Sequence, residues 1–180
     1  MAVNGTRQIV AIQLVGDALD LQHLYLDRAD HNVQALTAIT VAQIARSDLQ
    51  ALSSARPPIL QAITVSNLIE ASIAREWLLN IGRRSAVQRV AHLFCELAVR
   101  FEHQGLGDPQ NLVLPMTQEQ IGEATALTGV HVNRTIKVLH ESKVIARNGR
   151  AIALTNWSML KSIAEFNPDY LHQHQQVIGR

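Results

Sequence analysis

The residues best suited to chemistry lie in the C-terminal third of the chain, on one face of an expected helix. Val132, Ile136 and Leu139 recur at positions i, i+4 and i+7 and so predict the buried side of that helix. On or near the opposite side lie Val130, His131, Asn133, Arg134 and Lys137. An arginine can donate two hydrogen bonds to guanine O6 and N7, an asparagine or histidine can donate or accept, and a valine can contact a thymine methyl group. This face therefore indicates recognition of base edges in DNA.

Two helix-capping signals frame this face. Thr117 and Gln120 have the spacing of a capping box, which opens a short helix. Thr128 is a suitable N-cap for the second helix, VHVNRTIKVLHE, and Thr125–Leu127 would form the turn between the two. The inner side of the first helix would carry Ile121 and Ala124.

The segment KVIARNGRAIALT follows and predicts a strand, a turn and a second strand. Asn148-Gly149 is a strong hairpin signal because both positions tolerate positive φ. Two helices at a tight turn followed by a hairpin make a winged helix-turn-helix, whose second helix enters the major groove while flanking groups bind phosphates. The candidate DNA-binding residues are Thr117, Thr128, Gly129, Val130, His131, Asn133, Arg134, Lys137, Arg147 and Arg150.

The charge distribution permits a DNA partner. The formal net charge is only +1, but between Leu112 and Lys161 six basic side chains stand against three acidic ones. Affinity for nucleic acid is largely phosphate neutralisation, so this local excess suits DNA. A helical hairpin with a solvated polar face would show the same excess. The order of capping box, turn, second cap and hairpin favours the DNA interpretation.

The composition and the single cysteine exclude several classes of protein. With 47% hydrophobic and 17% charged residues the chain can bury a core, and no apolar run is long enough to span a bilayer. The first residues, MAVNGTRQIV, lack the zones of a secretory signal. Cys95 alone cannot form an intrachain disulfide. We expect a cytoplasmic protein without a membrane partner.

Other reactive residues form no recognisable catalytic or metal site. His92 and Cys95 lie three apart, and His172 and His174 lie in a polar tail, whereas a metal site needs three or four ligands. Cys95 on an apolar helix is interpreted as a core residue. The sequence contains no Gly-x-Ser-x-Gly, phosphate-loop or paired-carboxylate signature. We expect neither an enzyme nor a bound cofactor.

The elements that must position the DNA-facing helix begin with an N-terminal zone that runs to about Ala55. RQIVAIQLVGD and NVQALTAITVAQIA alternate with the period of strands, and Gly5, Gly16-Asp17 and DRADHN punctuate them as turns. The zone predicts several short antiparallel strands. A small helix, SDLQAL, capped by Ser47, would follow.

Arg56-Pro57-Pro58 then precedes a long apolar helix, expected from Ile59 to Ile81 and ended by Gly82. A helix that is apolar over much of its circumference must be covered on more than one side. Pairing with the same helix of a second copy would do this, and burial inside a monomer is the alternative. The candidate dimerisation residues are Ile59, Ile63, Ile69, Ile73 and Trp77.

SAVQRVAHLFCELAVRFEHQ predicts a further amphipathic helix that begins the third zone. Its inward residues would be Val87, Val90, Ala91, Phe94, Leu97, Ala98 and Phe101.

The stretch TQEQIGEATALTGVHVNRTIKVLHESKVI resembles the helix-turn-helix of the Crp/Fnr transcription regulators. IEASIAREWLLNIGRRSAVQRVAHLFCELAVRF is similar to that family's dimerisation helix and first DNA-domain helix, and GTRQIVAIQLVGDALDL resembles part of its β-roll sensor. The resemblance implies an α+β fold: a partial antiparallel, cupin-like β-roll in residues 1–57, a dimerisation helix in 58–82 and a winged helix-turn-helix in 83–180.

The resemblance also implies a homodimer that binds a palindromic operator and contacts RNA polymerase. In the family the residues after the second N-cap, with an Arg one turn further on, read bases, and Thr128 and Arg134 match in type. Gly129 and Val130 stand where the best-known members carry Arg and Glu, so a different operator is expected. A winged-helix protein-interaction module is the alternative; it would need an apolar docking patch in place of basic and amide side chains.

The sensor half departs from the family pattern. About half a β-roll would precede the first strand in a full member, so we expect a truncated chain or a late start. Cyclic nucleotide-binding members hold phosphate with a Gly-Glu and an Arg-Ser pair, where this chain has ALDL and RADHN. Iron–sulfur members need a cysteine cluster, which Cys95 alone cannot supply. The resemblance therefore leaves the small-molecule effector unknown.

Overall fold

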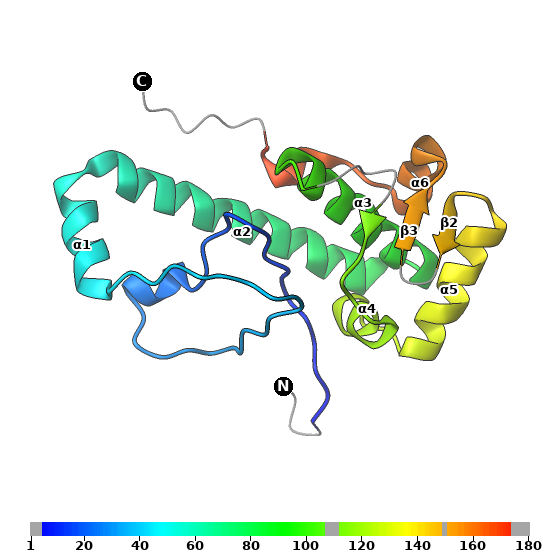
Figure 1. Cartoon of the computed structure of the whole chain (residues 1–180), viewed down its shortest axis with the longest axis horizontal. Coiled ribbons are helices and arrows are strands. Elements are labelled where there is room, and N and C mark those ends of the chain that lie inside the picture. The colour runs from blue at the N-terminus through cyan, green and yellow to red at the C-terminus, as the bar shows by residue number, and fades with distance from the viewer. Residues whose placement is uncertain (1–4, 107–111, 149–150, 174–180) are drawn as a thin grey trace.

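One long helix, α2 (Pro57–Arg83), links two unequal parts of the chain. The computed structural model describes residues 5–106, 112–148 and 151–173. Figure 1 shows α1 near the start of α2 and the helices of the C-terminal part around its end, with the first residues of the N-terminal segment running beside α4. The other elements are η1 (Leu21–Leu24), α1 (Arg46–Ala55), α3 (Ala86–His103), β1 (Leu112–Val113), α4 (Gln118–Thr125), α5 (Gly129–Glu141), β2 (Ile145–Asn148), β3 (Ala151–Leu154), α6 (Trp157–Ala164) and η3 (Pro168–Leu171).

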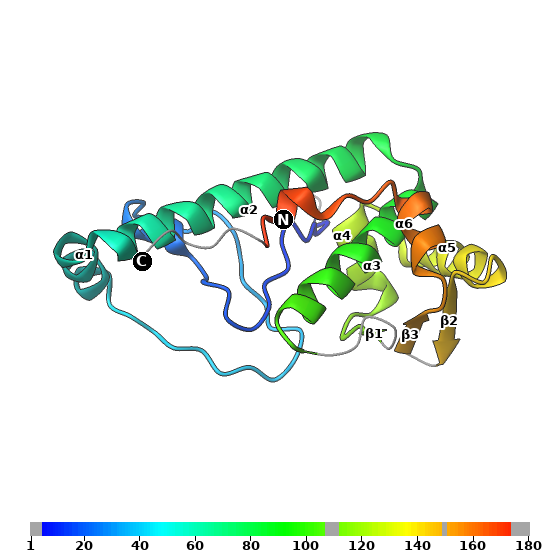
Figure 2. The same ribbon diagram turned by 90° about the horizontal axis from the view of Figure 1, so that it is seen from above.

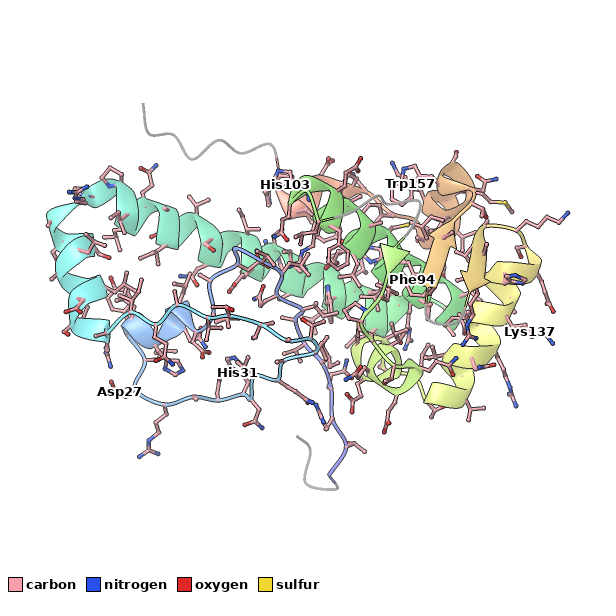
Figure 3. All side chains as sticks on the ribbon, viewed as in Figure 1. Asp27, His31, Phe94, His103, Lys137 and Trp157 are labelled. Carbon is pink, nitrogen blue, oxygen red and sulfur yellow. The ribbon has the colours of Figure 1, made fainter. Side chains whose placement is uncertain are left out.

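Helix α3 is the centre of the C-terminal part. It begins at a capping box in which Ser85 accepts from the Gln88 N–H and the Gln88 side chain accepts from the Ser85 N–H. The helix contacts α2, α4, α5 and α6, and Figure 3 shows Phe94 in the middle of this core. The predicted inward residues are confirmed as buried, with Val87 and Phe101 half-buried at the ends. The opposite face is also covered, because every residue from 90 to 98 is buried.

A three-stranded antiparallel sheet closes one side of this core in the order β1-β3-β2. The predicted strands after α5 are confirmed, with Ile145 opposite Leu154 and Arg147 opposite Ile152. Strand β1, opposite Ile152 and Ala151, was not predicted because two residues are too few for a periodic pattern. Of the expected turn residues Asn148-Gly149, Asn148 is the last residue of β2, opposite Ala151, and Gly149 lies outside the described residues.

The predicted N-terminal strands are wrong: residues 5–44 form no strand, and the partial β-roll is not formed there. A strand needs a neighbour about 4.8 Å away to pair its N–H and C=O groups. The backbone of this segment bonds elsewhere, with Asp17 N–H donating to Leu14 O at 3.1 Å and Ile9 N–H donating to Glu123 O of α4 at 3.1 Å. The alternating side chains consequently do not line one face of a sheet: Ile12 is buried in the core, whereas Val10 and Val15 are exposed at 63% and 72%. Gly16, with φ at 89°, does form the predicted turn.

Three helix ends differ from their predicted positions. Ser47 does not cap α1: the helix starts at Arg46 after Ala45, and the Ser47 hydroxyl donates to Asp48 instead. Gly82 does not end α2, which continues to Arg83. A Cβ at Gly82 would meet no described atom within 4 Å, so nothing there requires a glycine stop. The helix also starts two residues before the predicted Ile59, because Pro57 and Pro58 occupy its first turn, where an N–H has no partner in the helix.

A buried carboxylate, Glu96 of α3, joins the parts of the chain. It is 0% exposed and accepts from Trp77 Nε1 of α2 at 3.0 and 3.1 Å and from Tyr170 OH of η3 at 2.8 Å. Arg100 Nη1 lies 3.2 Å from the same carboxylate. Figure 2 shows η3 lying against α2. Burial raises the pKa of Glu96, while Arg100 and the two donors oppose that rise.

Arg100 extends this connection to the N-terminal segment. Its Nη2 donates to Ile12 O at 2.8 Å and lies 3.0 Å from the Asp17 carboxylate. Gln104 of the segment after α3 donates to the same carboxylate at 3.3 Å. The N-terminal segment is therefore held against α3 by polar bonds, although it has no sheet of its own.

We predict that Trp77→Phe destabilises the fold by about 2 kcal/mol, because a hydrogen bond to a buried charge is lost. The loss should grow as the pH rises through the raised pKa of Glu96, since the carboxylate needs the indole N–H more than the protonated acid does. Chemical denaturation at a series of pH values measures it. Trp157→Phe is the matched control, because Trp157 is 36% exposed and packs edge-on against Phe166. A pH-independent loss at Trp77 would contradict the assignment.

Candidate nucleic-acid interface

The first helix of the predicted pair, α4, begins as the sequence indicated. The Thr117 hydroxyl accepts from the Gln120 N–H at 3.2 Å, and Gln120 Oε1 accepts from the Thr117 N–H at 2.8 Å. Ile121 and Ala124 are buried against the core, so the predicted inner side is confirmed. Both helix-end donors at the start of α4 are thereby satisfied and its direction is fixed.

The turn between α4 and α5 is set by two backbone features. Ala126 has a left-handed conformation with φ at 54°, which reverses the chain after the last turn of α4. Gly122 packs so closely under the turn that a Cβ there would lie 2.4 Å from Leu127 O. The Leu127 N–H donates to Gly122 O at 2.9 Å and closes the turn. Only glycine at position 122 allows this approach without a shift of the backbone.

The second helix, α5, is oriented as predicted. Thr128 caps it by accepting from the His131 N–H at 3.2 Å, and Val132, Ile136 and Leu139 are buried. The predicted DNA-facing side is confirmed as exposed, with Val130 at 67% exposure; Figure 3 shows Lys137 pointing away from the helix into solvent. The exposed residues on this side are Val130, His131, Asn133, Arg134 and Lys137.

A shallow hollow of about 320 Å³ joins α5 to β2 along one flank of this face. It is lined by Asn133, Ile136, Lys137, His140 and Arg147. The structure therefore brings Arg147 of the hairpin next to the helix. His140 was not among the candidate residues. Its position one turn after Ile136 and just before β2 could have indicated that it lies beside the hairpin.

The remaining candidates surround this face. Thr117 and Thr128 are exposed at the starts of the two helices and Gly129 is half-buried between them. Arg150 lies outside the described residues. On α4, Glu123 is engaged by the N-terminal segment, with its carboxylate 3.6 Å from Arg7 Nε. The segment thus contacts the first helix of the pair.

The charge on the exposed face is set mainly by α5. Its first turn contains no acidic residue, and the Lys137 ammonium lies 3.7 Å from the Glu141 carboxylate. Both groups of that pair are largely exposed, so solvent screens it and Lys137 can be drawn to another anion.

The buried cysteine and histidine of α3 form no reactive site. Burial raises the pKa of the Cys95 thiol to about 12, and burial together with Arg84 lowers the pKa of His92 to about 3. His92 stacks on Tyr170 and lies edge-on to Phe166 in the core. Over the described ranges no three His, Cys, Asp or Glu residues group to hold a metal, and no helix is both long and apolar enough to cross a membrane.

The predicted dimerisation residues lie on the covered side of α2. Trp77 is only 8% exposed and bonds to Glu96, so most of its surface is already covered within the chain. Ile73 packs against the same core. Ile59, Ile63 and Ile69 are half-buried. The large apolar side chains that α2 exposes are Leu60, Leu68, Leu78 and Leu79.

Comparison with known proteins finds a matching family and several similar chains. Residues 88–163 match the Crp-like helix-turn-helix domain. The fumarate and nitrate reduction regulatory protein of Vibrio cholerae is 28% identical over 162 residues, which cover 89% of this chain and 64% of that protein. This chain therefore spans less than two thirds of that relative.

This chain covers a larger share of two nitrogen fixation regulation proteins named FixK. That of Bradyrhizobium diazoefficiens is 30% identical over 89% of this chain and 67% of its own length. That of Rhizobium meliloti is 30% identical over 89% of this chain and 70% of its own length. The solved structure of FixK2 from Bradyrhizobium japonicum has a TM-score of 0.61 at 26% identity, over 67% of this chain and 59% of that one.

We predict that Gly122→Ala destabilises the protein by about 1–3 kcal/mol, because the new methyl group would meet Leu127 O at 2.4 Å. Thermal unfolding measures the loss. Gly129→Ala is the matched control: its Cβ would lie 3.7 Å from Glu119 N, an ordinary contact, so stability should be unchanged or slightly higher. Equal effects of the two substitutions would contradict the close approach at Gly122.

Proposed function

The chain belongs to the Crp/Fnr family of transcription regulators, which are not enzymes, and we propose that it binds DNA sequence-specifically through α5 as a homodimer. The observation that carries the proposal is the exposed face of α5, fixed at its start by the Thr128 cap and at its base by the buried Val132, Ile136 and Leu139. A helix held in this way can enter a major groove, about 12 Å wide, as a rigid body.

Base reading is assigned to the first two turns of α5. Arg134 donates two hydrogen bonds to guanine O6 and N7, Asn133 and His131 bond to base edges, and Val130 contacts a thymine methyl group. The phosphates on either side are bound by Lys137, Thr117, Thr128, Gly129, Arg147 and Arg150. The flank hollow supports this part, because it gathers Lys137 and Arg147 beside His140.

The dimer is proposed to form along the open side of α2. One side of α2 carries four exposed leucines at close to helical spacing: Leu60, Leu68, Leu78 and Leu79. Leu68 and Leu78 are 63% and 66% exposed, and leaving such apolar side chains in water costs free energy. Two copies paired there would present two α5 helices to half-sites about 34–36 Å apart, which makes the operator palindromic.

We propose a division into domains that follows the roles proposed for α2 and α5. Residues 1–57 form the effector-type region, 58–82 the dimer helix and 83–180 the DNA-binding domain. Contact with RNA polymerase is the expected consequence of family membership for a regulator that activates transcription.

Selection of bound sites from random DNA tests the function. The purified protein should enrich one motif with two-fold symmetry. Absence of enrichment would contradict sequence-specific binding and favour a protein-docking role for the winged helix.

We predict that Arg134→Ala weakens binding to the selected site by about 1–3 kcal/mol and relaxes the preference at one base pair. Arg147→Ala should instead weaken binding to selected and random DNA alike and reduce the salt dependence, because a phosphate contact carries no sequence information. Fluorescence anisotropy at several salt concentrations measures both. If Arg134→Ala weakens random and selected DNA equally, its base-reading role is wrong.

We predict that Leu68→Asp dissociates the dimer, because each interface would bury two unpaired carboxylates. The dissociation constant of the dimer should rise by about a hundredfold or more, which sedimentation equilibrium measures. Met159→Asp on α6 is the matched control, since Met159 is similarly exposed but stands apart from α2. An unchanged dimer in Leu68→Asp would place the interface elsewhere.

A further inference from the structure

Two amide side chains are hydrogen-bonded across the helix pair. Asn133 Nδ2 in the second turn of α5 donates to Oε1 of Gln118, the first residue of α4, over 3.1 Å. Gln118 was not among the candidate residues, because the two positions lie 15 residues apart and belong to different helices. Its side chain is half-buried, whereas Asn133 is exposed on the DNA-facing side.

The backbones of Gln118 and Asn133 are held in fixed positions relative to each other, so their side-chain amides can stay within hydrogen-bond distance. The capping box at Thr117 sets the start of α4, and the close approach of Gly122 to Leu127 O sets the turn. A Cβ at Gly129 would lie 3.8 Å from the carbonyl carbon of Gln118, so the starts of α5 and α4 are in contact. The backbone positions from which the two side chains reach each other are consequently set by the motif.

We propose that Gln118 is a positioning residue that fixes the amide of Asn133, so that Asn133 selects an adenine in the operator. The assignment rests on the proposed function. An unrestrained asparagine amide can turn by half a rotation and exchange its donor for its acceptor. In the bond that the structure shows, Gln118 Oε1 accepts from Nδ2, so the Asn133 amide is held with Oδ1 turned away from Gln118.

The fixed amide matches one base. One Nδ2 hydrogen is taken by Gln118, which leaves Oδ1 and the second N–H side by side toward the groove. Adenine offers the complementary pair, since its N6 amino group donates to Oδ1 and its N7 accepts from the N–H. Guanine offers two acceptors, O6 and N7, so Oδ1 would face O6 without a hydrogen between them. Discrimination between the two purines therefore depends on which way the amide is turned.

The test compares base preference, affinity and stability in four variants. Selection with wild type and Asn133→Ala first identifies the base pair whose preference Asn133 sets. Duplexes with each of the four bases there are then titrated. Gln118→Ala should lose about fivefold or more of the adenine preference, with unchanged binding to random DNA and an unchanged Tm.

Gln118→Glu should restore the preference, because its carboxylate can still accept from Asn133 Nδ2, while its negative charge weakens binding to every sequence. Gln120→Ala is the structural control. It removes half of the capping box at Thr117, so it should lower the Tm and the affinity for all DNA without changing the base preference.

Gln118→Ala that keeps the adenine preference, or Asn133→Ala that alters no base preference, would overturn the assignment while leaving the proposed function intact. A wild-type protein that enriches no site would contradict the proposed function itself, and the assignment with it.

Discussion

The buried Glu96 carboxylate is the interaction on which the arrangement of the chain depends. It accepts hydrogen bonds from α2 through Trp77 and from η3 through Tyr170, and Arg100 connects it to the N-terminal segment at Ile12 and Asp17. A buried charge is tolerated only where its partners stay in place, so each of these elements is held at one position relative to α3. The carboxylate thereby joins α2 to the C-terminal part, together with the bond from Asn80 Nδ2 to Arg89 O.

The DNA-facing helix depends on more local constraints. Its direction follows from the caps at Thr117 and Thr128 and from the glycine at position 122, each of which acts within a few residues. The N-terminal segment adds a contact from outside through Ile9 and Glu123. The direction of α5 is therefore set within the helix pair, and the contacts of α3 and α4 determine how the pair lies relative to the rest of the chain.

These two kinds of constraint explain what the sequence could predict. The capping box, the second cap and the buried positions of α5 were all found, because their signals are separated by only a few residues. The buried position of Glu96 was not predicted, because a carboxylate on an amphipathic helix is normally solvated. Its partners Trp77 and Tyr170 also lie 19 and 74 residues away in the sequence. The alternation around Val10 and Ile12 predicted strands, but a strand exists only with a paired neighbour, which an alternating pattern does not specify. Trp77 was assigned to a dimer contact because apolar spacing shows that one side of a helix is covered, but not which neighbouring element covers it.

Methylation interference at guanine N7 on a selected site tests the central claim most directly, because N7 lies in the major groove. If α5 of each copy reads the groove, methylated guanines in two half-sites should block binding, with centres about 10–10.5 base pairs apart on one face of the duplex. Binding that tolerates N7 methylation throughout the site would contradict the account.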